Sequence, residues 1–148
     1  MEPAMTNIGI VLPLPGYLHG VEELCRKYGT LLIIDETHTI SADWGGMVTS
    51  ENLTPDFFTI GKAIAGGIPT GAYGMSFEVA ARIKEIVKRE YIDTVGIGGT
   101  LAGNALSLAA MRVTLSEVMT KENFAKMIEL ANIWSDGVDA AIKEYKLP

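Results

Sequence analysis

The sequence has few of the residues that secreted, metal-binding or membrane-spanning proteins use. Its 148 residues include one cysteine, Cys25, so no disulfide can form within the chain, and its helical surroundings indicate a helix residue rather than a nucleophile. One cysteine and two histidines give no zinc-binding pattern. The sequence also lacks a run of about 18 apolar residues and a basic amino terminus followed by an apolar stretch. We therefore expect a cytoplasmic protein with no metal site and no membrane contact.

Positive charge is scarce as well. Lys and Arg number 12 against 18 Asp and Glu, which leaves a net charge of −6 and no basic cluster. Nucleic acid and anionic membranes are therefore poor partners for this chain. The content of 48% hydrophobic and 20% charged residues is typical of a folded globular domain, and no internal repeat is present.

An unbroken apolar run, Leu31-Leu32-Ile33-Ile34, predicts a strand buried on both faces of a parallel sheet. Asp35 stands at its carboxyl end, where open α/β sheets bind ligands. A buried carboxylate needs a cation or good hydrogen bonds, so Asp35 is a candidate partner for a cationic group. Taken alone, Asp35 is better explained as a turn or cap residue.

Lys62 follows a second predicted strand, Phe57–Ile60, which a Pro-Asp turn introduces. Its neighbours in sequence are Ile, Ala and Gly, which predicts a desolvated amine. Desolvation lowers the pKa of a lysine and frees its amine to attack a carbonyl carbon, as Schiff-base formation requires. Taken alone, a lysine that reaches from a loop into water is the simpler explanation.

The remaining apolar periodicity predicts four helices, over residues 20–28, 77–88, 103–119 and 121–143. Gly29 is expected to end the first helix, and Ser76 and Thr120 are expected to cap the second and fourth. Residues 72–75 are predicted as an antiparallel or edge strand, and residues 41–50 as a loop. The apolar stripe of the last helix predicts a packing surface.

Glycines precede the third helix in the sequence Gly96-Ile97-Gly98-Gly99-Thr100. Free N–H groups at a helix amino terminus, with the Thr100 hydroxyl, suit a phosphate, although a flexible hinge explains the cluster better by itself. The spacing fits neither a dinucleotide fingerprint nor a P-loop. His38, close to Asp35, is equally well explained as a hydrogen-bonded loop residue or as a functional group.

These three features become specific when they are considered together. Pyridoxal 5′-phosphate has a pyridinium nitrogen that needs an acidic partner, an aldehyde that needs a lysine, and a phosphate that needs backbone donors. Asp35, Lys62 and the Gly99-Thr100 turn would supply one group for each.

The order and spacing of four motifs agree with this interpretation: EPAMTNIGIVLP, LLIIDE, FFTIGKAIAGGIPTGAYG and GGTLAGNALSLAA. Through them the sequence resembles, over nearly its whole length, the class III aminotransferases, which are fold type I pyridoxal-phosphate enzymes. Within that family it is most similar to the glutamate-1-semialdehyde aminomutase-like branch. The resemblance implies an α/β fold, namely part of the mixed, mostly parallel sheet with flanking helices of the large domain.

The resemblance also implies roles for single residues. Asp35 would pair with the pyridinium nitrogen, and Lys62 would form the Schiff base and carry protons through a pyridoxamine intermediate. Thr37 would lie against a ring face and His38 near the phenolic oxygen, where the family usually has an aliphatic residue followed by Gln or Met. Gly99 and Thr100 would bind the phosphate of the neighbouring subunit in a homodimer. A lesser departure is Ala105, where many members have Pro.

The family's first phosphate loop and the aromatic residue that stacks on the cofactor have no counterpart here. We therefore expect residues 1–120 to form the carboxyl-terminal half of the cofactor domain, and residues 121–148 a helix leading toward a small domain.

The predicted activity is that of an aminotransferase or aminomutase acting on an amino acid or on an amino-aldehyde or keto substrate. The alternatives are a non-catalytic remnant or one piece of a split protein that needs a partner chain. A decarboxylase or racemase on the same fold is a third possibility.

Overall fold

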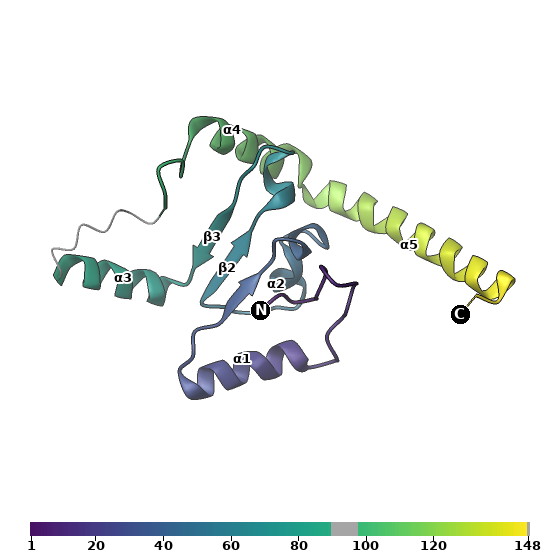
Figure 1. The fold of residues 1–148 in the computed structure, drawn as a ribbon, viewed down its shortest axis with the longest axis horizontal. Coiled ribbons are helices and arrows are strands. Elements are labelled where there is room, and N and C mark those ends of the chain that lie inside the picture. Colours follow the sequence, from purple (N-terminus) through teal and green to yellow (C-terminus); the bar gives the residue numbers. More distant parts are fainter. Residues whose placement is uncertain (90–97, 148) are drawn as a thin grey trace.

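The computed structural model describes residues 1–89 and 98–147. Its centre is a three-stranded sheet in the order β1-β2-β3 (Figure 1). β1 (Ile33–Asp35) runs parallel to β2 (Phe57–Ile60), and β3 (Ala72–Met75) pairs with β2 in the antiparallel direction. The predicted mixed sheet of an α/β fold is confirmed.

The helices follow the predicted order with shifted ends. The main helices are α1 (Tyr17–Tyr28), α2 (Gly46–Ser50), α3 (Phe77–Arg89), α4 (Ala105–Val113) and α5 (Lys121–Tyr145). Two short 3₁₀ turns, η1 (Thr39–Ser41) and η2 (Lys62–Ala65), and one π-helical turn, η3 (Thr114–Val118), complete the described elements. The prediction of a plain loop over residues 41–50 was wrong, because α2 occupies its second half. The predicted helix 103–119 is α4 continued by the π-helical turn.

Local capping signals were interpreted correctly. Gly29 ends α1 with φ 65°, a left-handed conformation that favours glycine. Ser76 Oγ accepts a hydrogen bond from the N–H of Val79 at 3.3 Å, at the start of α3. Thr120 Oγ1 likewise accepts from the N–H of Asn123 at 3.3 Å and begins α5. Side chains that satisfy free N–H groups at a helix start decide where these helices begin.

β1 is covered on one face only in the described part of the chain. Leu32 and Ile34 are buried, whereas Leu31 and Ile33 are 56% and 48% exposed. The expectation that β1 is buried on both faces was therefore wrong for this chain. Since side chains alternate along a strand, Asp35 lies on the same open face as Ile33.

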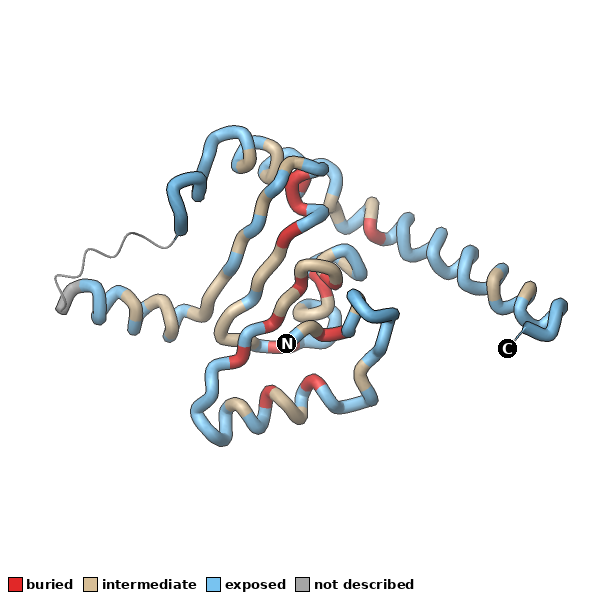
Figure 2. The backbone as a smooth tube through the Cα atoms, in the orientation of Figure 1, coloured by how far each residue is buried: buried red, intermediate tan, exposed pale blue. Residues whose placement is uncertain are grey.

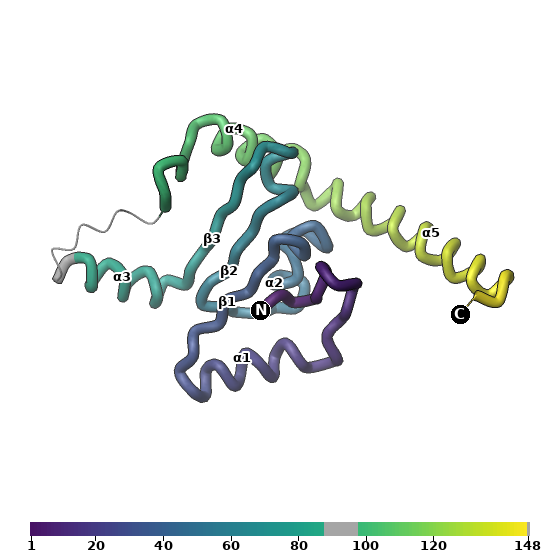
Figure 3. Tube along the Cα trace, in the orientation of Figure 1, coloured from purple at the N-terminus to yellow at the C-terminus, as the bar shows by residue number. Residues whose placement is uncertain are grey.

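The first residues lie beside the free edge of β1 (Figure 3). The Met1 amino group donates a hydrogen bond to the Ile33 carbonyl at 2.7 Å, and the Asp35 N–H donates to the Met1 carbonyl at 2.8 Å. This alternation of donor and acceptor is the pattern of a parallel pair. The segment that contains Glu2 and Thr6 is thereby held next to the end of β1.

α5 extends away from the sheet, and its residues are mostly exposed (Figure 2). Phe124 is its buried residue, whereas Trp134 is 72% exposed. The predicted packing surface is therefore covered at Phe124 but mostly exposed along the rest of α5 in the described part of the chain. Near the start of α5, η2 packs against α4 and η3 beyond the end of β2. Within residues 1–89 and 98–147, no helix combines the length and apolar character that crossing a membrane requires.

Candidate functional site

Asp35 ends β1 in register with Thr59 of β2. Its Oδ1 accepts a hydrogen bond from the backbone N–H of Thr37 at 2.9 Å. Hydrogen bonds from the side chain and then the backbone of Thr37 lower the pKa of Asp35, although partial burial acts in the opposite direction. The Thr59 side chain and the positive charge of Lys62 lower this pKa further. Asp35 is therefore an ionised carboxylate, ready to accept a hydrogen bond from a cationic N–H.

Lys62 is separated from the end of β2 by Gly61 and is the first residue of η2. Its φ of 50° places it in the left-handed region, which costs a residue with a Cβ about 1–2 kcal/mol. The side chain is exposed, so the expectation that its apolar sequence neighbours bury the amine was wrong for this chain. Ile64 and Ala65 are instead buried in the core. An unusual backbone conformation at an exposed lysine is a feature of functional sites.

Thr37 and Thr70 both lie close to Gly61, the residue before Lys62. A Cβ on Gly61 would lie 3.4 Å from Thr37 Cγ2 and 3.6 Å from the Thr70 carbonyl oxygen. The Thr70 hydroxyl is buried without a hydrogen-bond partner in the described part of the chain. Since buried hydroxyls normally find a partner, Thr70 Oγ1 is an unusual polar group in a residue whose backbone lies close to Gly61. Thr70 carries no sequence signal that would have marked it as a site residue.

His38 lies beside the amino-terminal segment. Its Nδ1 hydrogen-bonds with the Thr6 hydroxyl, and Glu2 Oε2 is 4.0 Å from the same nitrogen. The interpretation of His38 as a hydrogen-bonded loop residue is thus confirmed. This hydrogen bond leaves room for a functional role, because it uses Nδ1. In the described part of the chain, Nε2 has no hydrogen-bond partner and can bind a ligand.

Gly99 and Thr100 are not brought to Asp35 and Lys62 in the single chain. Both are exposed in the turn that precedes α4, and no hydrogen bond joins either to the other candidate residues within the described ranges. Asn104, not a glycine, caps α4, accepting from the N–H of Ser107 at 2.9 Å. Gly96 and Ile97, the start of the predicted cluster, lie outside the described residues.

Glu36 was missed by the sequence analysis. It is 1% exposed, and its carboxylate accepts hydrogen bonds from the Thr39 hydroxyl at 2.6 Å and the N–H groups of Met47 and Val48 at 3.0 and 2.6 Å. A negative charge at the start of α2 satisfies N–H groups that have no partner inside the helix. Strand alternation could have placed Glu36 on the buried face of Ile34.

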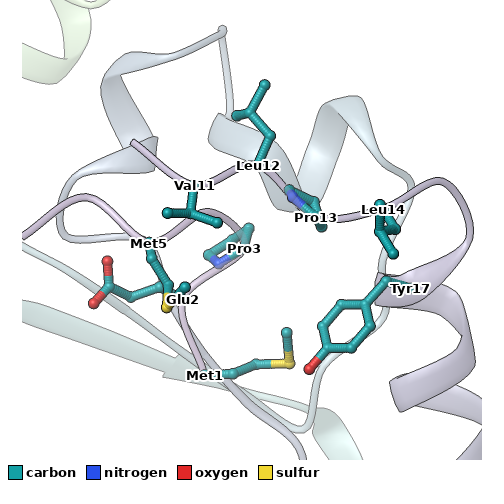
Figure 4. Close-up of a pocket in the computed structure, with 9 residues that line it drawn as sticks. All are labelled: Met1, Glu2, Pro3, Met5, Val11, Leu12, Pro13, Leu14 and Tyr17. Carbon is teal, nitrogen blue, oxygen red and sulfur yellow. The ribbon is translucent and has the colours of Figure 1, made fainter. Parts of the chain in front are cut away.

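A separate hollow of about 540 Å³ lies between the amino-terminal segment and the start of α1 (Figure 4). Its walls are mainly apolar: Met1, Pro3, Met5, Val11, Leu12, Pro13, Leu14 and Tyr17, with Glu2 as the charged member. Neither Asp35 nor Lys62 lines it. A hollow without these groups cannot be the reaction site suggested by the sequence. Among the described residues, no group of three or more His, Cys, Asp and Glu side chains could hold a metal ion.

The residues at the ends of β1 and β2 therefore have a defined chemistry. Asp35 offers an ionised carboxylate, Lys62 offers an amine, and Thr70 offers a buried hydroxyl without a partner. A ligand with a cationic N–H and a reactive carbonyl would satisfy the first two groups. Pyridoxal phosphate has both, so the residues present fit this group.

Comparison with known proteins places the chain in a family. Residues 1–147 match the model of the family described as aminotransferase class-III. The chain is 36% identical to the glutamate-1-semialdehyde 2,1-aminomutase of Anaeromyxobacter dehalogenans (strain 2CP-C), and the alignment covers 100% of this chain and 33% of that protein.

Solved structures of similar enzymes agree with this family assignment. A glutamate-1-semialdehyde-aminomutase from Pseudomonas aeruginosa PAO1 matches with a TM-score of 0.91 and 47% identity, covering 100% of this chain and 34% of that one. A lysine-to-alanine variant of such an enzyme from the same organism is in complex with PMP. An omega-transaminase from Sphaerobacter thermophilus matches with a TM-score of 0.78 and 30% identity, over 99% of this chain and 33% of that one.

The chain thus spans about a third of the length of these relatives. Because the family match extends over residues 1–147, the chain belongs to the class-III aminotransferases.

Proposed function

We propose that this chain carries the cofactor-binding centre of a pyridoxal-phosphate-dependent aminotransferase or aminomutase. The observation that carries the proposal is the juxtaposition of Asp35 and Lys62. They follow two adjacent parallel strands, and the charge of Lys62 acts on the Asp35 carboxylate. The carboxyl ends of parallel strands lie at one edge of a sheet, so one small ligand can reach both side chains.

When bound, pyridoxal phosphate supplies an aldehyde and an electron-withdrawing pyridinium ring. Asp35 would hold a proton at the ring nitrogen, because its lowered pKa keeps it ionised. The Lys62 amine would hold the cofactor covalently and, once released, move a proton at the substrate α-carbon. Thr37 would lie against one ring face, and His38 would lie beside the ring.

The phosphate is assigned to Gly99 and Thr100 of a neighbouring copy. Their exposed position before α4 supports this proposal, since they are free to meet another surface. It requires a homodimer with shared active sites. We further propose that residues 1–120 belong to the cofactor domain, that residues 121–148 lead toward a second domain, and that the protein acts in the cytoplasm.

The substrate is proposed to be an amino acid or an amino-aldehyde or keto compound. The name of the Anaeromyxobacter relative, a 2,1-aminomutase, supports an internal amino shift, whereas the omega-transaminase match supports transfer between two molecules.

The proposal is tested by titrating pyridoxal phosphate into the natural polypeptide that carries this chain. Binding through Lys62 should produce the absorption band of a lysine-bound cofactor, and Lys62→Ala should abolish that band. Lys126→Ala, at an exposed lysine on α5, is the matched control and should keep it. An unchanged band in Lys62→Ala would exclude the assigned role. Asp35→Ala should retain the band but lose most turnover, and near-normal turnover would contradict the role of Asp35.

A second candidate is a non-catalytic remnant or one piece of a split protein. The specific observation in its favour is the number of large apolar side chains left in water, among them Phe77 at 93% and Leu101 at 80% exposure. Such patches mark surfaces that are covered in the working protein. Light scattering of the 148-residue chain alone should show association if the chain is one piece of a split protein, and a monodisperse monomer would contradict that form of the candidate.

A further inference from the structure

Three side chains, Glu2, Thr6 and His38, form a continuous hydrogen-bonded chain beside the end of β1. The Thr6 hydroxyl donates to Glu2 Oε2 at 3.1 Å, and the Thr6 hydroxyl oxygen also hydrogen-bonds with His38 Nδ1. Thr6 and His38 are 32 positions apart in the sequence. The fold brings them together because the amino-terminal segment is hydrogen-bonded to β1 through Met1.

The direction of these hydrogen bonds follows from the number of protons available. A carboxylate only accepts, and a threonine hydroxyl has one proton. Since the Thr6 proton is given to Glu2, the Thr6 oxygen must accept from His38, and Nδ1 must carry a hydrogen. A neutral His38 is therefore the Nδ1–H tautomer, with its lone pair on Nε2. The hydrogen positions are assigned from this network.

The surroundings strengthen the chain of hydrogen bonds. The side chains of Glu2 and His38 are 35% and 29% exposed, and Pro3 and Ala4 between Glu2 and Thr6 are buried. Within residues 1–89 and 98–147, His38 is the only basic side chain within 4.0 Å of the Glu2 carboxylate. The Glu2 carboxylate is thus linked to the imidazole through Thr6 and lies 4.0 Å from Nδ1 directly.

A lone pair on Nε2 restricts what His38 can bind. A phosphate presents oxygen acceptors, so a neutral Nδ1–H histidine is a poor phosphate ligand. A phenol presents an O–H donor, for which Nε2 is a suitable acceptor. On the ring of pyridoxal phosphate, the phenol is the substituent that offers such a proton.

We propose that Glu2 and Thr6 are positioning residues that keep the neutral His38 in the Nδ1–H tautomer, so that Nε2 accepts the phenolic proton of bound pyridoxal phosphate. When the proton moves from the phenol oxygen to Nε2, a phenolate and an imidazolium form, and Glu2 stabilises the imidazolium through Thr6. No other reactant is consumed. This inference rests on the proposed function for the identity of the ligand, whereas the tautomer rests on the hydrogen bonds alone.

The tautomer is measured by long-range ¹H–¹⁵N spectra of the natural polypeptide labelled at histidine, without cofactor. His19→Gln identifies the signals of the other histidine of this chain. His38 should carry its hydrogen on Nδ1. Thr6→Val, which keeps the size but removes the hydroxyl, should shift that hydrogen to Nε2, whereas Thr6→Ser should leave it on Nδ1. A hydrogen on Nε2 in the unmodified protein, or an unchanged tautomer in Thr6→Val, would overturn the inference.

The cofactor-loaded protein provides the second measurement. Thr6→Val should shift the absorption of the bound cofactor toward the form with a protonated phenol, and Thr6→Ser should restore the original spectrum. If Lys62 carries the cofactor but Thr6→Val leaves the spectrum unchanged, this inference fails while the proposed function stands. If no cofactor binds, the proposed function fails and the assignment of the phenol fails with it.

Discussion

The left-handed conformation of Lys62 leads to a quantitative prediction. At φ 50° a side chain with a Cβ costs about 1–2 kcal/mol, and a glycine avoids that cost. Glycine in turn loses roughly 0.5–1 kcal/mol more backbone entropy on folding than alanine does. The Lys62→Gly variant should therefore be more stable than the Lys62→Ala variant by about 0.5 kcal/mol. Both variants lack the amine, so its interaction with Asp35 cancels from the comparison.

The assay is urea unfolding of both variants without cofactor, in the natural polypeptide that carries this chain. At an unchanged slope, the expected difference corresponds to a midpoint higher by about 0.2 M urea or less for Lys62→Gly, because the slope grows with the surface exposed on unfolding. Lys126, in the interior of α5, provides a control of opposite sign. There the glycine variant should be less stable than the alanine variant by about 1 kcal/mol.

A Lys62→Gly variant that is less stable than Lys62→Ala would refute the reasoning, because it would mean that position 62 is not in the left-handed region. The expected result would show that the chain keeps a strained backbone at the one residue whose amine the proposed reaction needs. Stability and the position of the amine would then be in conflict at Lys62.

Three further predictions concern the surrounding structure. Glu36→Ala should cost about 4 kcal/mol in unfolding free energy and Glu36→Gln about 2 kcal/mol, because three hydrogen bonds end on this buried carboxylate; a loss typical of an exposed site would contradict this. Burial acts to raise the pKa of Glu22, but hydrogen bonds from Arg26 and Thr54 outweigh it and lower this pKa in the folded protein. Ionised Glu22 therefore stabilises the fold above its unfolded pKa, and this stabilisation is lost as the pH falls through its folded pKa. Urea midpoints at decreasing pH should fall less steeply in Glu22→Gln, and an unchanged pH dependence would exclude this contribution. Thr120→Ala should lower the unfolding free energy by about 1 kcal/mol in thermal unfolding, and Thr120→Ser should keep most of it. Equal stability of Thr120→Ala and the unmodified protein would show that this cap does not stabilise α5.

Local signals in the sequence were sufficient for much of the fold. Gly29, Ser76 and Thr120 were identified as caps because a cap depends on residues within four positions. The two strands β1 and β2 were predicted from their apolar runs, and the mixed, mostly parallel sheet from the resemblance to the family. Burial was harder to predict. The pattern of β1 indicates two covered faces, but coverage depends on which other elements reach the sheet, and Ile33 remains 48% exposed.

At the candidate site, too, some features follow from local sequence and others depend on the tertiary structure. The sequence by itself determined that an acid and a lysine follow consecutive strands, since strand order and spacing are contained in the local pattern. Only the tertiary structure decided how these residues are presented: the left-handed φ of Lys62, the capping of α2 by Glu36, and the bond between His38 and Thr6. The capping by Glu36 and the His38–Thr6 hydrogen bond each join residues at least 11 positions apart. The backbone conformation of Lys62 depends on the packing around η2. Such features are set by how distant segments fold together, which no short sequence window contains.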